Sequence, residues 1–185
     1  MKITAAITLT FLGLTASSSF AQAVNFEGAS IGVNYNAVNS TAALGGVSTS
    51  GRDQALSLNG KYTKAVSNQI TVGAALDLGL GQLQSGSNVK GTGQYSVALE
   101  AGFATSSTLL VFGEISFNGV KRQVELNGAT QSDDFSGIGY GLGLRSLISK
   151  NVYWQAELLQ RDYDAKSNGN EFKSTGLAVG VGYKF

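Results

Sequence analysis

The 185-residue chain contains no cysteine, no proline and no histidine. Without cysteine it can form neither a disulfide framework nor a thiolate nucleophile. Without histidine it lacks the imidazole of a Ser-His-Asp arrangement and the commonest metal ligand. Proline is excluded from central strands because it cannot donate to the hydrogen-bond ladder, so its absence suits a sheet in which every strand has two neighbours.

Charged residues are also scarce, at 14% of the chain, compared with about 25% in an ordinary soluble domain. The formal net charge is only +1, so no strong field favours nucleic acid, and we expect no nucleic-acid partner. Hydrophobic residues reach 43%, yet the mean hydropathy is only +0.06. This combination argues against a bundle of membrane helices, whose apolar residues would form long uninterrupted runs.

The first 23 residues have the pattern of a secretory signal peptide. Lys2 supplies a minimal positive region, residues 3–16 are uncharged and largely apolar, and the segment 17–23 offers small residues at the spacing that cleavage requires. Cleavage could follow Ala21 or Ala23, and the spacing fits both sites. A membrane anchor helix would need about 18 consecutive apolar residues, and this run is too short. We therefore expect an exported mature protein that occupies residues 24–185.

The last eleven residues, T-G-L-A-V-G-V-G-Y-K-F, alternate strictly between two kinds of side chain. One register is apolar from Leu177 to Phe185, and the other consists of glycine, alanine and Lys184. An apolar outer face and a small or polar inner face are typical of a transmembrane β-strand. On the inner face, Gly176, Gly180 and Gly182 are expected to leave room for charged side chains of neighbouring strands.

The same alternation recurs along the mature chain in segments long enough to cross a bilayer when tilted, since about 9 to 11 residues suffice. The expected strands are 26–38, 54–64, 69–82, 94–105, 108–119, 135–147, 151–163 and 175–185. In the fifth and seventh segments, Leu110, Phe112 and Leu159 are apolar on the register expected to face inward. A slip of one residue in either segment therefore remains open.

The connections between these segments alternate in length. Short links are expected at 65–68, 105–107 and 148–150, and longer polar loops at 39–53, 83–93, 120–134 and 164–170. Short turns on one rim and long loops on the other are typical of outer-membrane barrels, and an even number of strands lets the sheet close. We predict an all-β fold, an eight-stranded antiparallel up-and-down transmembrane β-barrel.

Charged residues within the strands fall on the register opposite the apolar one. We expect a polar network inside the barrel made by Lys61, Asp77, Glu100, Glu114, Arg145, Glu157 and Arg161. Because an eight-stranded barrel is only wide enough for side chains, ion pairs there would fill the lumen. Glu100, Glu114 and Glu157 could instead form an acid/base site, which we consider less favoured. We therefore expect no catalytic residues, no metal centre, no cofactor and no enzyme activity.

At this point the chain resembles the small eight-stranded outer-membrane β-barrel proteins of Gram-negative bacteria, such as OmpX and the barrel domain of OmpA. The resemblance covers the mature chain and rests on strand count, loop alternation and the terminal G-V-G-Y-K-F. In such proteins a last strand that ends in an aromatic residue is the assembly signal. The resemblance therefore implies that Val181, Tyr183 and Phe185 are recognised by the barrel-assembly machinery.

The same resemblance implies location in the cell outer membrane, in contact with its lipid. Two functions then fit the sequence. The first is a structural or surface-interaction role in which the long loops contact an extracellular ligand. The second is a narrow porin-like channel or transporter of small molecules.

Overall fold

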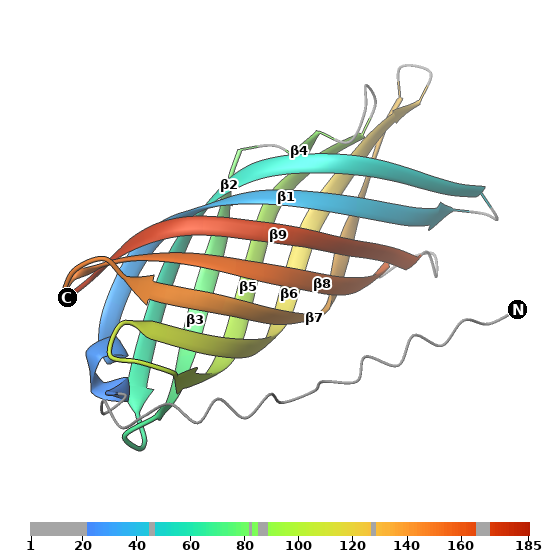
Figure 1. Cartoon of the computed structure of the whole chain (residues 1–185). Helices are drawn as coiled ribbons and strands as arrows, with labels where there is room; N and C mark the ends of the chain where they lie inside the picture. Colours follow the sequence, from blue (N-terminus) through green and yellow to red (C-terminus); the bar gives the residue numbers. More distant parts are fainter. Residues whose placement is uncertain (1–21, 45–46, 82, 85–88, 127–128, 166–170) are drawn as a thin grey trace, which may run out of the picture.

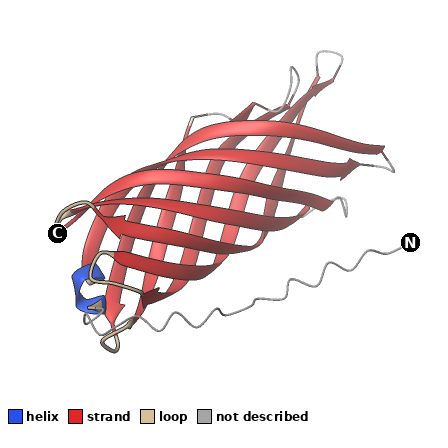
Figure 2. Cartoon of the chain, viewed as in Figure 1, coloured by secondary structure: helices blue, strands red, loops and turns tan. Residues whose placement is uncertain are grey.

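The computed structural model describes residues 22–44, 47–81, 83–84, 89–126, 129–165 and 171–185. Nearly all of these residues are in strands, and one short 3-10 helix, η1 (Ala23–Phe26), lies at one end (Figure 2). In the part of the chain that is described, no helix has the length and apolarity needed to cross a bilayer. Apart from Gln22 and Ala23, the predicted signal peptide lies outside the described residues, so its cleavage remains a prediction.

The sheet contains eight long strands and one very short one. They are β1 (Gly28–Leu44), β2 (Val47–Ala65), β3 (Ile70–Leu80), β4 (Leu83–Gln84), β5 (Val89–Ala104), β6 (Leu109–Leu126), β7 (Ala129–Leu147), β8 (Val152–Ala165) and β9 (Glu171–Lys184). Each of the eight long strands overlaps one of the predicted segments. The two-residue β4 pairs only with β5 and is not part of the barrel ring.

Pairing between non-consecutive strands closes the sheet. Consecutive long strands pair antiparallel around the ring, and β1 also pairs with β9, from Ser30 opposite Lys184 to Ala43 opposite Glu171. The chain therefore forms a closed eight-stranded antiparallel barrel, as the alternating pattern predicts (Figure 1). The C-terminus and η1 lie at the same end as the short turns, which makes this the periplasmic end of the barrel.

Except for β3, the strands extend beyond the predicted segments at the opposite end. β1 and β2 pair up to Leu44 opposite Val47, and β6 and β7 pair up to Leu126 opposite Ala129. The predicted loops 39–53 and 120–134 are thus wrong, because most of these residues are strand. Likewise, the loop predicted at 83–93 contains β4 and the start of β5.

The predicted loop 164–170 overlaps the ends of β8 and β9, and its residues 166–170 lie outside the described part of the chain. The predicted strands were too short because apolar–polar alternation marks a strand only where one face of it meets lipid. Above the membrane the outer face no longer meets lipid, so the regular alternation of apolar and polar residues is lost although the backbone ladder continues.

Side-chain burial settles the register of the two ambiguous strands. Leu110, Phe112 and Leu159 are 0%, 1% and 5% exposed, whereas outward-facing residues such as Leu99 and Phe117 are more than half exposed. Leu110, Phe112 and Leu159 therefore face inward as expected, and neither β6 nor β8 is shifted by one residue.

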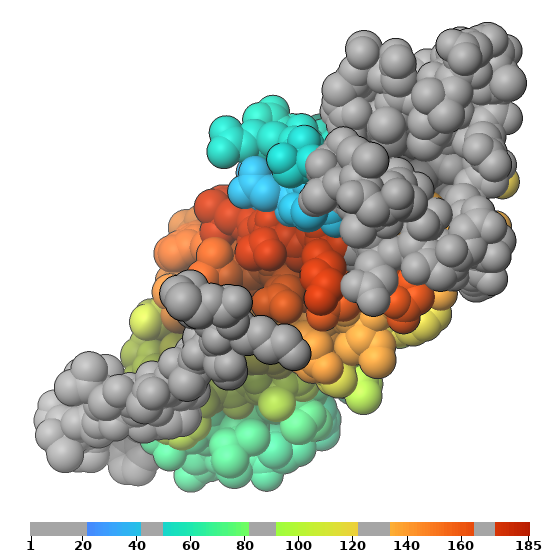
Figure 3. Space-filling view, turned by 90° about the vertical axis from the view of Figure 1, so that its right-hand side faces the viewer, coloured from blue at the N-terminus to red at the C-terminus, as the bar shows by residue number. Residues whose placement is uncertain are grey.

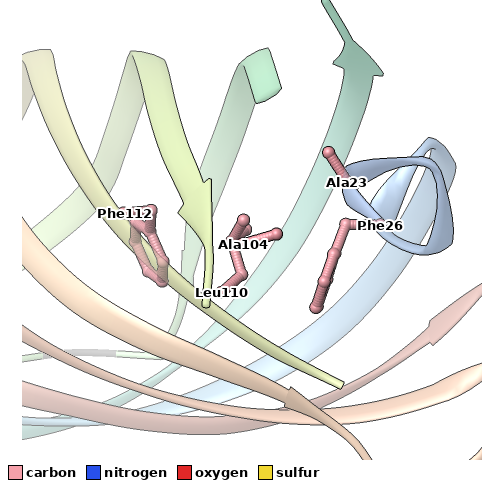
Figure 4. Packing of buried hydrophobic residues seen from close by; sticks show 5 residues of the cluster. All are labelled: Ala23, Phe26, Ala104, Leu110 and Phe112. Atoms are coloured by element: carbon pink, nitrogen blue, oxygen red, sulfur yellow. The ribbon is translucent and has the colours of Figure 1, made fainter. Parts of the chain in front are cut away.

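The apolar inward residues close the periplasmic end of the barrel. Leu110 and Phe112 belong to one buried cluster with Ala104 and with two residues of η1, Ala23 and Phe26 (Figure 4). The N–H of Ala23 donates to the carbonyl of Asn68, at 2.9 Å, which fixes the helix against the turn between β2 and β3. The sequence pattern gave no sign of this cap, because η1 is too short for any periodicity to reveal it.

Candidate functional site in the barrel interior

Three charged side chains from three strands meet in the lower half of the interior. Lys61 of β2 donates to Glu100 of β5 at 3.1 Å, and Arg145 of β7 donates to both oxygens of Glu100, at 3.0 and 2.6 Å. All three side chains are at most 5% exposed. A buried carboxylate held by a guanidinium fork and an ammonium has two cations to offset its desolvation. We call Lys61, Glu100 and Arg145 the interior triad.

An aromatic ring lies against both cations of the triad. The Nζ of Lys61 is 5.0 Å from the ring centroid of Phe112, and the guanidinium carbon of Arg145 is 4.8 Å from the same centroid. Both distances are within the range of cation–π attraction, which strengthens where water is excluded. Phe112 thus joins the interior triad to the apolar cluster at the periplasmic end.

Uncharged side chains carry the network from Arg145 across the lumen. Its Nε donates to Gln155 at 3.3 Å, and Gln155 donates to the amide oxygen of Asn34 at 3.1 Å. Asn34 in turn donates to Asp77 at 3.1 Å. This chain of bonds links β7, β8, β1 and β3, so the interior is cross-braced independently of the backbone ladder.

Asp77 is held by neutral donors. Besides Asn34, the hydroxyl of Ser57 donates to it at 3.2 Å and the amide of Asn59 at 2.7 Å. The described residues place no lysine or arginine nitrogen within ion-pair distance of Asp77. It therefore belongs to the hydrogen-bond network, and is stabilised there by dipoles.

Glu114 and Glu157 face each other over a glycine. Glu114 is the register partner of Gly141, and a Cβ at residue 141 would collide with side-chain atoms of both glutamates. Glu114 is also directly opposite Glu100 on the neighbouring strand. Among the described residues, Glu157 Oε1 has no hydrogen-bond partner. These two carboxylates are therefore gathered beside the interior triad without a cation bound to either in the described part of the chain.

Arg161 lies higher on β8, on the same inward face as Glu157. It is buried, and its Nε has no hydrogen-bond partner among the described residues. The seven predicted interior residues are thus placed in one lumen, but with different partners. Three of them form ion pairs with one another. A chain of hydrogen bonds through the side-chain amides of Gln155 and Asn34 connects Arg145 to Asp77.

Three uncharged residues that connect the interior were not among the predicted network, which contained charged residues only: Asn34, Tyr153 and Gln155. Phe112 was expected on the inward register, but its contact with Lys61 and Arg145 was not. For Asn34, Tyr153 and Gln155 the available signal was their position on the inward register.

The inner glycines of the last strand also have neighbours other than those expected. Gly182 lies under the ring of Tyr153, and Gly180 lies under the side chain of Asn34. The expectation that these glycines make room for charged side chains was wrong, because both overlying groups are uncharged. The glycines are nevertheless required by space, since a Cβ at either position would overlap the side chain above it.

Residues predicted to form the assembly signal lie on the outer surface near the C-terminus. Val181, Tyr183 and Phe185 are 60%, 46% and 73% exposed. The rings of Tyr183 and Phe185 pack edge to face with centroids 5.4 Å apart. Their side chains are accordingly presented to lipid at the periplasmic end, beside the free end of the last strand.

One residue, Glu27, ties the start of the barrel chain to the ends of β2 and β9 at the periplasmic rim. Glu27 accepts a hydrogen bond from Lys64 at 2.9 Å and another from the N–H of Ala65 at 3.2 Å, and its own carbonyl accepts one from Lys184 at 3.1 Å. The hydrogen bond from Lys64, followed by that from Ala65, lowers the pKa of Glu27 below its ordinary value of 4.5. We call these four residues the rim latch.

No group of three or more His, Cys, Asp or Glu residues in the described part of the chain is placed to hold a metal ion. The geometry instead provides cross-bracing, with buried polar groups that connect six of the eight barrel strands.

Comparisons with known proteins agree with this architecture. The sequence profile of a family described as "Outer membrane protein beta-barrel domain" matches residues 7–185. No curated protein matches the sequence.

Several solved structures share the fold. Ail, the attachment invasion locus protein of Yersinia pestis, is 18% identical, with a TM-score of 0.58 over 86% of this chain and 99% of Ail. Neisserial surface protein A is 20% identical, with a TM-score of 0.59 over 86% of this chain and all of that one. OprG of Pseudomonas aeruginosa is 14% identical, with a TM-score of 0.50 over 86% and 96%. At these identities the likeness concerns the fold alone.

Proposed function

Because the chain belongs to the outer membrane protein beta-barrel domain family, we propose that it is a surface-interaction barrel whose lumen is filled by its own side chains. It is anchored by its apolar outer face and contacts partners outside the cell through the strands that project above the membrane. The barrel-assembly machinery inserts it through the exposed Val181, Tyr183 and Phe185.

The observation that carries this proposal is the length of the hairpins at the extracellular end. On β1 and β2 the outward-facing residues change from apolar to polar above Ala37 and Leu56, yet the two strands stay paired to Leu44 and Val47. Paired strands hold a fixed shape outside the lipid, which a flexible loop does not. Rigid projecting ribbons suit contact with another macromolecule.

The interior supports the same reading. The interior triad occupies the lumen directly above the apolar cluster that contains Leu110 and Phe26, and Phe112 of that cluster contacts both cations of the triad. An eight-stranded barrel is only wide enough for its own side chains, so these layers oppose the passage of solutes. The name of Ail states attachment as its role, and a surface role for this chain agrees with that similarity in fold.

Planar-bilayer conductance of the refolded protein tests the proposal. We expect no stable single-channel steps from the native chain. The double variant Glu100→Ala with Arg145→Ala removes two large groups from the lumen and serves as the positive control, with small steps expected. Reproducible steps from the native chain would instead favour the second candidate, a narrow channel.

A further inference from the structure

Two carboxyl groups of the lumen, those of Glu114 and Glu157, have no donor among the described residues. By contrast, Glu100 is held by both cations of the interior triad, and Asp77 accepts hydrogen bonds from three neutral side chains. Glu157 is only 6% exposed, and its Oε1 is buried without a hydrogen-bond partner in the described part of the chain. An ionised carboxylate in this position would bear its full cost of desolvation.

The two carboxyl groups approach the same point of the barrel wall. A Cβ built on Gly141 would overlap Oε1 of Glu157 and would lie 2.7 Å from Cγ of Glu114. The two side chains come from β8 and β6, and they meet over Gly141 of the intervening strand β7. Glu100 is the register partner of Glu114 on β5 and adds a further carboxylate on that side. Two carboxylates that share a site do not both stay ionised unless a cation joins them.

The charged side chains around the pair do not supply that cation. They come from five strands, and they are Lys61 of β2, Asp77 of β3, Glu100 of β5, Arg145 of β7 and Arg161 of β8. The inward-facing residues of β1 and β9 at this level, such as Asn34 and Ala178, are uncharged. Lys61 and Arg145 are bound to Glu100, and in the described structure Arg161 is not within ion-pair distance of either member of the pair.

The charges of the lumen do not balance. Between the rim latch and the extracellular ribbon, the described inward-facing residues include three cations and four carboxyl groups, namely Lys61, Arg145 and Arg161 against Asp77, Glu100, Glu114 and Glu157. A closed wall surrounds them, in which β1, β9 and β8 lie side by side in blue, red and orange in Figure 3. One further positive charge would neutralise the set.

We propose that Glu114 and Glu157 share one bound proton at neutral pH, so that a carboxylic acid on one side donates to a carboxylate on the other across Gly141. A hydrogen bond between an acid and its carboxylate is short and strong, and it satisfies the buried acceptor of Glu157. A proton needs no shell of ligands, and the described residues contain no group of three acidic side chains arranged for a metal ion. The inference concerns the lumen and goes beyond the proposed surface role.

Folding would then take up a proton. In the unfolded chain both carboxyl groups are ionised at neutral pH, whereas the folded barrel keeps one of them protonated. The folded state therefore binds more protons than the unfolded state, and its stability falls as the pH rises. The chain contains no histidine and no cysteine, so only the α-amino group ordinarily titrates in the same range.

Infrared spectroscopy of the refolded barrel in detergent tests the proton directly, because a protonated carboxyl has a C=O stretching band separate from the bands of carboxylates. The native chain is expected to show this band at neutral pH. Glu114→Gln and Glu157→Gln are each expected to lose it, since the amide N–H replaces the shared proton as the donor. Glu27→Gln makes the same change in the rim latch and should keep the band.

Absence of the band from the native barrel would overturn the proposal, and so would its loss in Glu27→Gln. Its survival in either lumen variant would show that the proton is not shared between the two residues.

The pH dependence of urea unfolding gives an independent test. With one proton taken up on folding, the equilibrium constant for unfolding of the native chain is expected to rise about tenfold per pH unit near neutral pH. Both lumen variants should lose this dependence, because their amide donors do not titrate. A native stability that is flat in this range would contradict the shared proton.

Salt distinguishes the proton from a metal cation. Stability at neutral pH is expected to be equal in sodium chloride and in choline chloride of the same concentration. A gain in sodium chloride that Glu157→Gln removes would overturn the proposal, since the pair would then hold the metal cation. Channel steps from a native barrel that keeps the infrared band would support the shared proton and count against the filled lumen of the proposed function alone.

Discussion

Arg145 and Glu100 form a bidentate pair in the barrel interior, with nitrogen–oxygen distances of 3.0 and 2.6 Å. Lys61 approaches the same carboxylate from the other side at 3.1 Å. The planar fork of the guanidinium fixes the angle between the two side chains as well as their distance. A contact between β5 and β7, which are not neighbours in the sheet, is thus set by side chains alone.

Replacing Arg145 by alanine is expected to destabilise the barrel by about 3 to 5 kcal/mol, because Glu100 would stay buried with only Lys61 to offset its charge. Urea unfolding of the refolded protein, followed by tryptophan fluorescence, measures the loss. Arg145→Lys keeps the charge without the fork and is expected to recover only part of the stability. Unchanged stability of Arg145→Ala would contradict the bracing role of the triad.

Gly182 and Gly60 form a matched pair for testing the space on the two faces of the wall. A Cβ at Gly182 would overlap the ring of Tyr153, whereas a Cβ at Gly60 meets nothing within 4 Å. Gly182→Ala is therefore expected to cost about 1 to 3 kcal/mol, and Gly60→Ala much less. Adding Tyr153→Val to Gly182→Ala should restore part of the loss in the same unfolding assay. Equal costs of the two alanine variants would argue against the packing of Tyr153 over Gly182.

The rim latch predicts a pH dependence at the acidic end. The pKa of Glu27 is lower in the folded chain than its ordinary 4.5, chiefly because of the bond from Lys64. Such a group contributes stability that is complete above the unfolded pKa and is lost as the pH falls through the folded one. A carboxyl carbon-13 NMR titration should place the midpoint of Glu27 below 4.5, and Lys64→Met should raise it. An unshifted midpoint would mean that the latch is not formed in solution.

A substitution at Phe185 is expected to impair assembly in the cell without impairing folding in detergent. It is 73% exposed, and its ring contacts that of Tyr183. Phe185→Ser is expected to lower the amount of folded barrel in the outer membrane several-fold, since the exposed ring is part of the proposed recognition signal. Refolding of the purified variant into detergent should proceed as for the native chain. Equal reductions in both settings would indicate a purely structural role.

The buried position of Ala23 predicts the site of signal-peptide cleavage. Ala23 is fully buried in the apolar cluster of η1, and its N–H donates to Asn68. Cleavage after Ala21 keeps these contacts, whereas cleavage after Ala23 removes them. Intact mass spectrometry of the exported protein is expected to show a chain that begins at Gln22. A chain that begins at Val24 would disprove this expectation.

The membrane-spanning part of the fold could be predicted from sequence because lipid imposes a period of two. Leu76 and Leu78 must face lipid, and Ala75 and Asp77 must then face inward. Above the lipid this constraint disappears, so Ser40 and Asp53, which are bonded inside the extended β1–β2 ribbon, read as loop residues. The extent of the ribbons depends on backbone pairing, which leaves no periodic trace in polar sequence.

The interior could be predicted only as a set of inward-facing charges. Their pairing depends on the stagger between strands, which decides that Glu100 lies opposite Glu114 and within reach of Arg145. Alternation within single strands contains no information on stagger. Uncharged connectors such as Gln155 were missed for the same reason, since their role becomes visible only when Arg145 and Asn34 are known to flank them.

The contacts of the rim latch also constrain the order in which the barrel forms. Glu27 precedes the first strand, and its contacts reach Ala65 at the end of β2 and Lys184 at the end of β9. The bond from Lys184 to the backbone carbonyl of Glu27 can form only after the last strand has met the first, whereas the bonds of the Glu27 carboxylate need only the end of β2. A probe attached at Lys184 would therefore distinguish a closed barrel from a sheet that is still open between β1 and β9.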